Sequence, residues 1–392
     1  MRFTLIAGVA AASLILAAPA FAQGPTDAEK VAASAQMPRG KVKAGYKVPR
    51  LADGRPELEG VWTNATATRL ERPANYGDAL LMDKAEAARQ EKATFDRNAR
   101  INAPTAKETT DNWKELAKGP DKLDECRGGS LGTACGYNAG WTDPGDLIMR
   151  VDGQPRTSLI TFPANGRMPA RVAGAPRPRQ VVESSESGPE IVRAGQNDNP
   201  EGRSLGERCI MSFGISSGPI MTPQLYNNTY KIVQTKDTVA IWVEMVHDMR
   251  LVRLNSKHRT DGVTPWMGDS IGWWDGDTLV VETTNIPKEE AFFGSWKDLK
   301  VTERFRRVAP DRLYYSFQVD DPSVWAKPWG GEYEFHPLKG ELYEYACHEG
   351  NYALPDMLQG ARRQEAEAAA KANAPAAAAP AKPAGGRPGG AN

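Results

Sequence analysis

Short segments in which apolar and polar residues alternate dominate the chain beyond residue 146. Each segment is rich in Val, Ile, Tyr, Thr or Trp, and turn residues separate most of them. Repeated hairpins without helices between them predict an antiparallel sheet. The predicted strands are residues 147–152, 157–162, 229–235, 238–246, 250–254, 277–284, 299–308, 312–319, 331–336 and 341–347.

We therefore expect a mainly β fold, an antiparallel β-barrel or sandwich with one or two peripheral helices. Residues 83–99 are rich in Ala, Glu, Lys and Arg and predict a surface helix. The tripeptide Gly60-Val61-Trp62 resembles the Gly-x-Trp entry of lipocalin-like barrels, which favours a calycin-like barrel.

The segment Trp266–Thr284 is the most strongly patterned part of the chain. It places three Trp, three Gly and three Asp in a turn that leads into a Leu/Val strand. Its glycines suit tight backbone at positive φ, and its aspartates can close turns on that backbone. The segment matches no catalytic signature with a known mechanism.

The two ends differ from the middle in composition. Arg2, the apolar run of residues 5–18 and Ala20-Phe21-Ala22 are typical of a cleaved signal peptide covering residues 1–22. We expect a flexible arm at 23–50, a single β-rich domain at 51–360, and a disordered Ala/Pro/Gly-rich tail at 361–392. The mature protein is expected in the periplasm, without membrane insertion.

Charge and cysteine content narrow the class further. Lys+Arg and Asp+Glu each total 49, so nothing in the charge balance points to a nucleic-acid partner. The even number of cysteines in an exported chain predicts disulfides. We favour the pairs Cys126–Cys135 and Cys209–Cys347, and a cysteine zinc site is the alternative.

The first candidate site lies around His247, in the segment Glu244–Arg250. A hairpin bend near His247 and Asp248 would place an imidazole beside a carboxylate, with Arg250 close by. Such a group can act as a general base or hold a substrate. A pair that only caps the turn is the alternative.

A second candidate lies at the end of the predicted strand 341–347, where Glu344, His348 and Glu349 occur. We expect His247, Asp248, Arg250, His348 and Glu349 to be catalytic and to share one pocket. Substrate-binding candidates are Arg156, Asp321, Arg304 and Glu344, and structural ion pairs are their alternative reading. No cofactor is predicted, but a divalent metal held by histidines and a carboxylate is an alternative.

Several motifs together resemble a family of exported bacterial proteins for which no reaction is established. The similarity covers roughly residues 50–360, and Asp275 and Ile286 stand where the family pattern has Glu and Phe. It implies one exported domain and no particular chemistry. The motifs are Arg55–Trp62, Arg156–Ile160, Gly166-Arg167, Gly206–Cys209, Glu244–Arg250, Trp266–Thr284, Asp320–Pro322 and Tyr343–Asn351.

Two functions follow from these observations. The first is a periplasmic hydrolase or lyase that acts on a small organic or carbohydrate-like substrate by His/carboxylate acid–base catalysis. The second is a calycin-like protein that binds a small apolar or aromatic ligand between Trp and Tyr side chains. Clustered Asp, Glu, His and Arg favour the enzyme, and the lack of a catalytic motif favours the binding protein.

Overall fold

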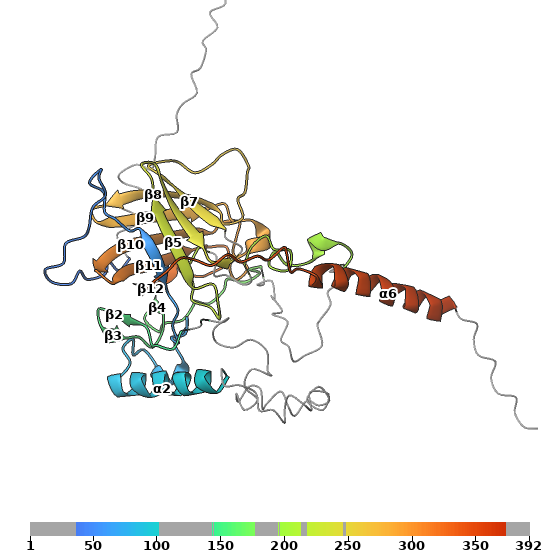
Figure 1. Ribbon diagram of the computed structural model, residues 1–392, viewed down its shortest axis with the longest axis horizontal. Coiled ribbons are helices and arrows are strands. Elements are labelled where there is room, and N and C mark those ends of the chain that lie inside the picture. Colours follow the sequence, from blue (N-terminus) through green and yellow to red (C-terminus); the bar gives the residue numbers. More distant parts are fainter. Residues whose placement is uncertain are drawn as a thin grey trace, which may run out of the picture. The chain divides into compact units, whose positions relative to one another are not determined.

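The structure is a computed structural model that describes residues 37–101, 143, 145–176, 195, 197–212, 218–245 and 248–373 (Figure 1). The chain divides into two compact units. One unit comprises Met1–Gln180 and Met211–Tyr345, and the other comprises Val181–Ile210 and Ala346–Asn392. No helix among the described residues is long and apolar enough to cross a membrane.

The first unit contains a closed β-barrel of nine strands. The barrel closes because β1 pairs with β5 on one side and with β12 on the other. In order around the barrel the strands are β1 (Gly60–Thr63), β5 (Thr229–Gln234), β6 (Thr238–Val243), β7 (Met249–Leu254), β8 (Asp269–Asp275), β9 (Thr278–Thr284), β10 (Lys300–Ala309), β11 (Arg312–Asp320) and β12 (Trp329–Pro337).

The predicted mainly β fold and its barrel are confirmed, with one change in strand direction. Neighbouring strands of the barrel are antiparallel except β7 and β8, which run parallel. β4 (Ile160–Phe162) pairs with β12 outside the closed ring, and β2 (Arg150–Val151) forms a small hairpin with β3 (Gln154–Pro155).

Aromatic side chains fill the described part of the barrel interior. Tyr230, Tyr315, Phe317, Tyr333 and Phe335 are fully buried and come from β5, β11 and β12. The centroids of their contacting rings lie 4.8–6.2 Å apart. Because these rings contact one another, this region is a packed core, as in other small barrels.

The helix of the first unit lies outside the barrel, as predicted. α2 (Lys84–Ile101) corresponds to the helix expected at 83–99, and Asp83 caps its start by accepting from the backbone N–H of Ala85 at 2.8 Å. Its buried Ala87 packs with Met82 and Ile148. Short 3-10 turns are η1 (Ala74–Tyr76), η3 (Pro200–Gly202) and η5 (Lys288–Glu290), and the second unit ends in α6 (Ala353–Asn373).

The described end of the N-terminal arm crosses the outer face of β10 and β11. The backbone N–H of Lys43 donates to the carbonyl of Val308 at 2.9 Å, and the Ser316 hydroxyl donates to the carbonyl of Pro38 at 3.0 Å. These contacts cover part of the outward-facing side of the two strands.

Two strand predictions differ from the structure. Residues 341–347, predicted to be a strand, are not one, and β8 lies where the sequence pattern predicts a turn. The first prediction was wrong because alternation alone cannot supply a partner, and both sides of β12 are already paired with β11 and β1. The prediction for β8 was wrong because the three glycines and three aspartates of Trp266–Thr284 are typical of turns, although the backbone of β8 is extended.

In the second unit, Cys209 and Cys347 form the predicted disulfide, with their Cα atoms 5.6 Å apart. Asn351 supports the same region by donating its side-chain amide to the carbonyl of Glu207 at 2.8 Å. Disulfides are typical of proteins in oxidising compartments. The other predicted pair, Cys126–Cys135, lies outside the described residues.

Candidate functional site

A charged cluster lies inside the barrel, centred on Arg250 of β7 and Glu303 of β10. The two side chains are 1% and 0% exposed and form a two-point ion pair, with Nη1 3.0 Å from Oε1. Arg250 also donates to the hydroxyls of Ser270 at 3.0 Å and Thr283 at 2.8 Å. Burial opposes the charge on Arg250, but the Glu303 carboxylate offsets this, and the pKa of the guanidinium is raised.

Tyrosines and backbone groups complete the interior cluster. The Tyr315 hydroxyl donates to Glu303 at 2.8 Å and accepts from the backbone N–H of Met221 at 3.3 Å. Tyr333 and the Asn64 amide both donate to the carbonyl of Met221. Burial raises the pKa of Tyr315 and of Tyr333 well above the usual value, so both stay protonated. The charges of Arg250 and Glu303 are therefore matched within the fold, whereas the Oδ1 of Asn64 has no hydrogen-bond partner among the described residues.

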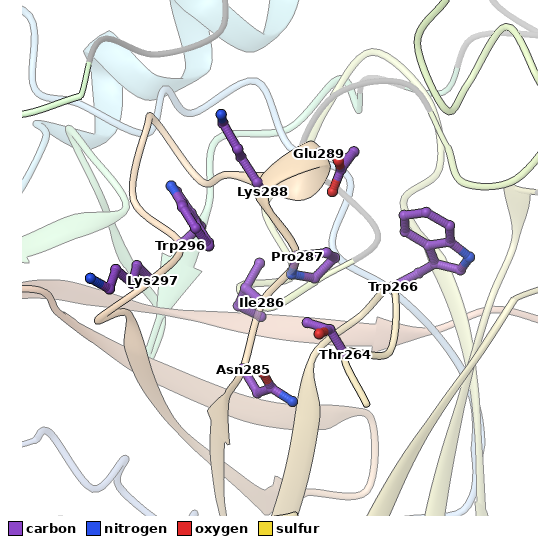
Figure 2. A pocket seen from close by; sticks show the side chains of 9 residues that line it. All are labelled: Thr264, Trp266, Asn285, Ile286, Pro287, Lys288, Glu289, Trp296 and Lys297. Atoms are coloured by element: carbon purple, nitrogen blue, oxygen red, sulfur yellow. The ribbon is translucent and has the colours of Figure 1, made fainter. Parts of the chain in front are cut away.

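An open cleft of about 470 Å³ lies outside the barrel, beyond the end of β9 (Figure 2). Its volume lies within the range of small-ligand pockets. Ile286 and Pro287 are buried at its base, and Figure 2 shows Trp266 and Trp296 on opposite sides of them. The lining residues are Thr264, Trp266, Asn285, Ile286, Pro287, Lys288, Glu289, Trp296 and Lys297.

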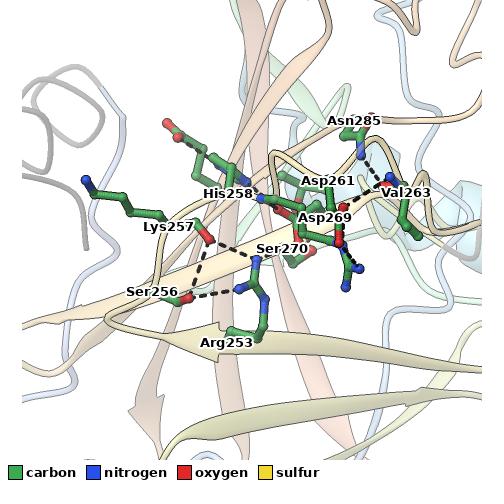
Figure 3. Close-up of polar contacts among 12 residues, drawn as sticks. Arg253, Ser256, Lys257, His258, Asp261, Val263, Asp269, Ser270 and Asn285 are labelled. Atoms are coloured by element: carbon green, nitrogen blue, oxygen red, sulfur yellow. Dashed lines mark hydrogen bonds and ion pairs between the residues drawn. The ribbon is translucent and has the colours of Figure 1, made fainter. Parts of the chain in front are cut away.

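The Trp266 side of the cleft belongs to the connection between β7 and β8, residues 255–268. Buried Asp269 holds this connection by accepting from the backbone N–H of Arg259 at 2.7 Å and from the Arg253 guanidinium at 2.8 Å (Figure 3). Asn285, at φ +57°, donates its amide to the carbonyl of Val263 at 2.7 Å. The end of β9 is thereby joined to the segment that carries Trp266.

His258 adds a second clamp to the same connection. Its Nδ1 lies 3.0 Å from Asp269 and its Nε2 lies 3.2 Å from Glu282 of β9. Burial lowers the pKa of the imidazole, but hydrogen bonds to Glu282 and Asp269 outweigh this, and the pKa is raised. Since both ring nitrogens face carboxylates, the protonated form makes both hydrogen bonds as donor.

The Trp296 side of the cleft is held by Asp321, which follows β11. The Asp321 carboxylate accepts from the hydroxyl of Ser295, the residue before Trp296, and from the Ser323 backbone N–H at 2.9 Å. A tight turn supports this segment, because Phe292 and Ser295 exchange backbone hydrogen bonds of 2.7 and 2.9 Å. Asp321, predicted to bind substrate, therefore positions the loop that carries Trp296.

The cleft combines aromatic surface with unmatched positive charge. Lys288 and Lys297 are exposed at its rim, and neither forms an ion pair with any residue that the structure describes. Glu289 is the acidic residue among the lining side chains. Two ammonium groups and one carboxylate leave a net positive rim beside two indole rings.

The predicted catalytic residues do not all lie in the described structure. His247 lies outside it, so its position relative to Arg250 stays a prediction. Asp248 is half-buried between β6 and β7, where its carbonyl accepts from the Val243 N–H at 2.9 Å. His348 and Glu349 are exposed and belong to the second unit, so the shared pocket also stays a prediction.

The remaining predicted binding residues are mostly engaged in the fold. Arg156 pairs with Glu332 at 2.7 Å, and Arg304 pairs with Asp275 at 2.8 Å. Glu344 is exposed on the segment after β12. Within the described ranges, no group of three His, Cys, Asp or Glu side chains could hold a metal ion.

The sequence did not single out Lys288, Trp296 and Lys297 as site residues. They lie on the connection between β9 and β10, and no strand or helix periodicity relates their positions in sequence. Trp266 was noticed only as part of a patterned segment. The available signal was two lysines and a tryptophan shortly after a strand, in Asn285–Lys297, although Glu289 and Glu290 lie in the same segment.

Comparisons of the chain with protein-family models, with curated proteins and with solved structures gave no match. The family resemblance of its sequence motifs is therefore not tested by these comparisons.

Proposed function

We propose that this protein binds a small ring-containing organic ligand in the cleft between Trp266 and Trp296. The observation that carries the proposal is the cleft itself, which has ligand-sized volume and an indole on either side of an apolar base. Indole faces bind flat rings through dispersion and offset stacking. The packed aromatic interior of the barrel supports an external site over a ligand held inside.

The support on each side of the cleft agrees with a binding role. Asp269 and Asp321 are both buried, and the carboxylate oxygens of each accept hydrogen bonds from the loop that carries one of the two tryptophans. A site fixed by buried hydrogen bonds loses less conformational entropy when a ligand enters. The cleft is thus prepared before binding.

Binding is tested by nuclear magnetic resonance on protein labelled with 15N in its indoles, titrated with naphthalene-2-carboxamide and naphthalene-2-carboxylate. At least one compound should shift two indole signals, which Trp266→Phe and Trp296→Phe assign to the cleft. Tyr343→Ala, an exposed aromatic residue outside the cleft, is the matched control and should bind as the parent does. If neither compound shifts either signal, the proposal is wrong.

We also propose that the protein acts in the periplasm. The apolar run of residues 5–18 followed by Ala20-Phe21-Ala22 supports export, and the Cys209–Cys347 disulfide supports an oxidising destination. Recovery of the protein from cells with Met1 intact in the cytoplasmic fraction would contradict this assignment.

A second candidate function, acid–base catalysis, is favoured by the interior cluster. A buried Arg250–Glu303 pair costs desolvation energy inside the barrel, and such groups often mark functional sites. His247 lies three positions before Arg250 in sequence. If the candidate holds, 4-nitrophenyl esters or glycosides should be hydrolysed by the parent and not by His247→Ala, at an unchanged melting temperature. Absence of any release by the parent would remove these hydrolase classes.

A further inference from the structure

We infer that the cleft selects ligands whose ring carries a carboxylate or similar anionic group. This inference rests on the proposed binding function and narrows its ligand class. It starts from the charge of the rim, where Lys288 and Lys297 face solvent without a carboxylate partner among the described residues.

The lysines of the cleft differ from several cationic side chains around the barrel that are already paired. Arg253 pairs with Asp269 at 2.8 Å, Lys231 pairs with Glu341 at 2.6 Å, and Arg304 pairs with Asp275 at 2.8 Å. Each of these charges is already matched inside the protein. The two cleft lysines can therefore contribute attraction to an incoming anion without first breaking an internal ion pair.

The rest of the lining favours a flat apolar ring over a sugar. Trp266, Trp296, Ile286 and Pro287 present apolar surface, while a sugar needs several hydrogen-bonding partners. The Asn285 amide already donates to the carbonyl of Val263, which removes one such donor. An aromatic ring between the indoles would contact the apolar lining, and its anionic group would face the two lysines.

Glu289 allows the proposed effect of rim charge on ligand affinity to be tested in the opposite direction. Its carboxylate lines the same rim as the lysines and should repel an anion. Removing that charge should therefore strengthen binding of a carboxylate, whereas removing a lysine should weaken it. A purely apolar cleft predicts no effect from either change.

The test compares naphthalene-2-carboxylate with its neutral amide by isothermal titration calorimetry on the full chain. The carboxylate should bind about tenfold more tightly, and Lys288→Gln or Lys297→Gln should each weaken it about threefold without altering amide affinity. Glu289→Gln should tighten carboxylate binding, and 0.5 M NaCl should reduce the preference. Lys339→Gln, exposed and outside the cleft, should leave both affinities unchanged.

The outcomes separate the two proposals. Equal affinity for carboxylate and amide would overturn the anion selectivity while leaving the binding function in place. Binding of neither compound would end both proposals. A loss in Lys339→Gln equal to that in the cleft variants would attribute the preference to overall charge, and tighter binding of glucuronate than of naphthalene-2-carboxylate would overturn the choice of an aromatic ring.

Discussion

The barrel interior and the external cleft both place charged groups beside aromatic rings, but they treat those charges differently. Inside, Arg250 and Glu303 are almost fully buried and matched to each other, and hydroxyls occupy further hydrogen-bonding positions. At the cleft, Lys288 and Lys297 face solvent without an internal partner among the described residues. A matched, buried charge contributes to conformational order, whereas an unmatched, exposed charge is available to a ligand.

The largest effect should come from breaking the interior pair. Glu303→Ala leaves the buried guanidinium of Arg250 uncompensated, and we expect the free energy of unfolding to fall by about 3–5 kcal/mol. Chemical denaturation measures this loss. The double variant Arg250→Met/Glu303→Leu removes both charges and should recover much of the stability. A loss below about 1 kcal/mol in the single variant would show that the pair is not desolvated as described.

A smaller effect should follow from changing Gly268, which lies beside Thr283 of the interior cluster and Ile286 of the cleft base. This residue has φ +72°, and an added Cβ would meet the side chain of Ile286 and lie 2.9 Å from the carbonyl oxygen of Thr284. Gly268→Ala should therefore cost about 1–3 kcal/mol of unfolding free energy and weaken ligand binding, because Ile286 forms the cleft base.

Gly276→Ala is the matched control for that substitution. Gly276 has φ +60°, but an added Cβ there would find nothing within 4 Å. Gly276→Ala therefore introduces backbone strain without a steric collision. It should lower the free energy of unfolding by about 1 kcal/mol and leave ligand affinity unchanged. Denaturation and ligand titration compare the two variants. Equal losses of unfolding free energy and equal ligand affinities would show that Ile286 does not form the base of the cleft.

The His258 clamp should give a modest dependence of stability on pH. Because its pKa is raised in the folded protein, the stabilisation is fully present below the unfolded value of about 6.5 and is lost as pH rises through the folded value. Asp269, Glu282, Arg253, Arg259 and Lys300 are the charged groups around this clamp.

We expect the parent to exceed His258→Asn by about 1–2 kcal/mol of unfolding free energy at pH 6, with a smaller difference at high pH. Denaturation across pH 5–9 measures this difference, and His348→Gln, an exposed histidine of the second unit, is the control. A difference that grows with pH would contradict the assigned protonation.

The smallest stability effect should occur at the cleft lysines. Lys288→Gln and Lys297→Gln should change the free energy of unfolding by less than about 0.5 kcal/mol, because exposed side chains without partners contribute little. Thermal and chemical denaturation check this expectation. A larger loss would mean that the lysines serve the fold, and the contrast with Arg250 would disappear.

The barrel was largely predictable because alternation reports which side of a strand is buried. Residues 229–235, 299–308 and 312–319 were predicted within two residues of β5, β10 and β11. The parallel pairing of β7 with β8 was not predictable, because the sequence pattern did not reveal β8 as a strand and alternation does not report strand direction. Nor did the pattern of 341–347 reveal that no pairing position was left for it.

The site was less predictable than the fold. The sequence pointed to Arg250 as catalytic and to Asp321 as substrate-binding. Both are buried in the structure, and their partners Glu303 and Ser295 are distant from them in sequence. The cleft side chains come from two separate connections, so no local spacing could show that they line one space. The shared pocket of His247 and His348 remains a prediction.

The parallel neighbours β7 and β8 have a consequence for how this protein can acquire new specificity. Parallel strands cannot be joined by a tight hairpin, so the chain must return along the barrel through residues 255–268. The entropy cost of such a connection grows slowly with its length. One wall of the cleft can therefore be lengthened, shortened or replaced while every strand of the barrel keeps its register, which makes this crossover the natural place to graft a different recognition loop.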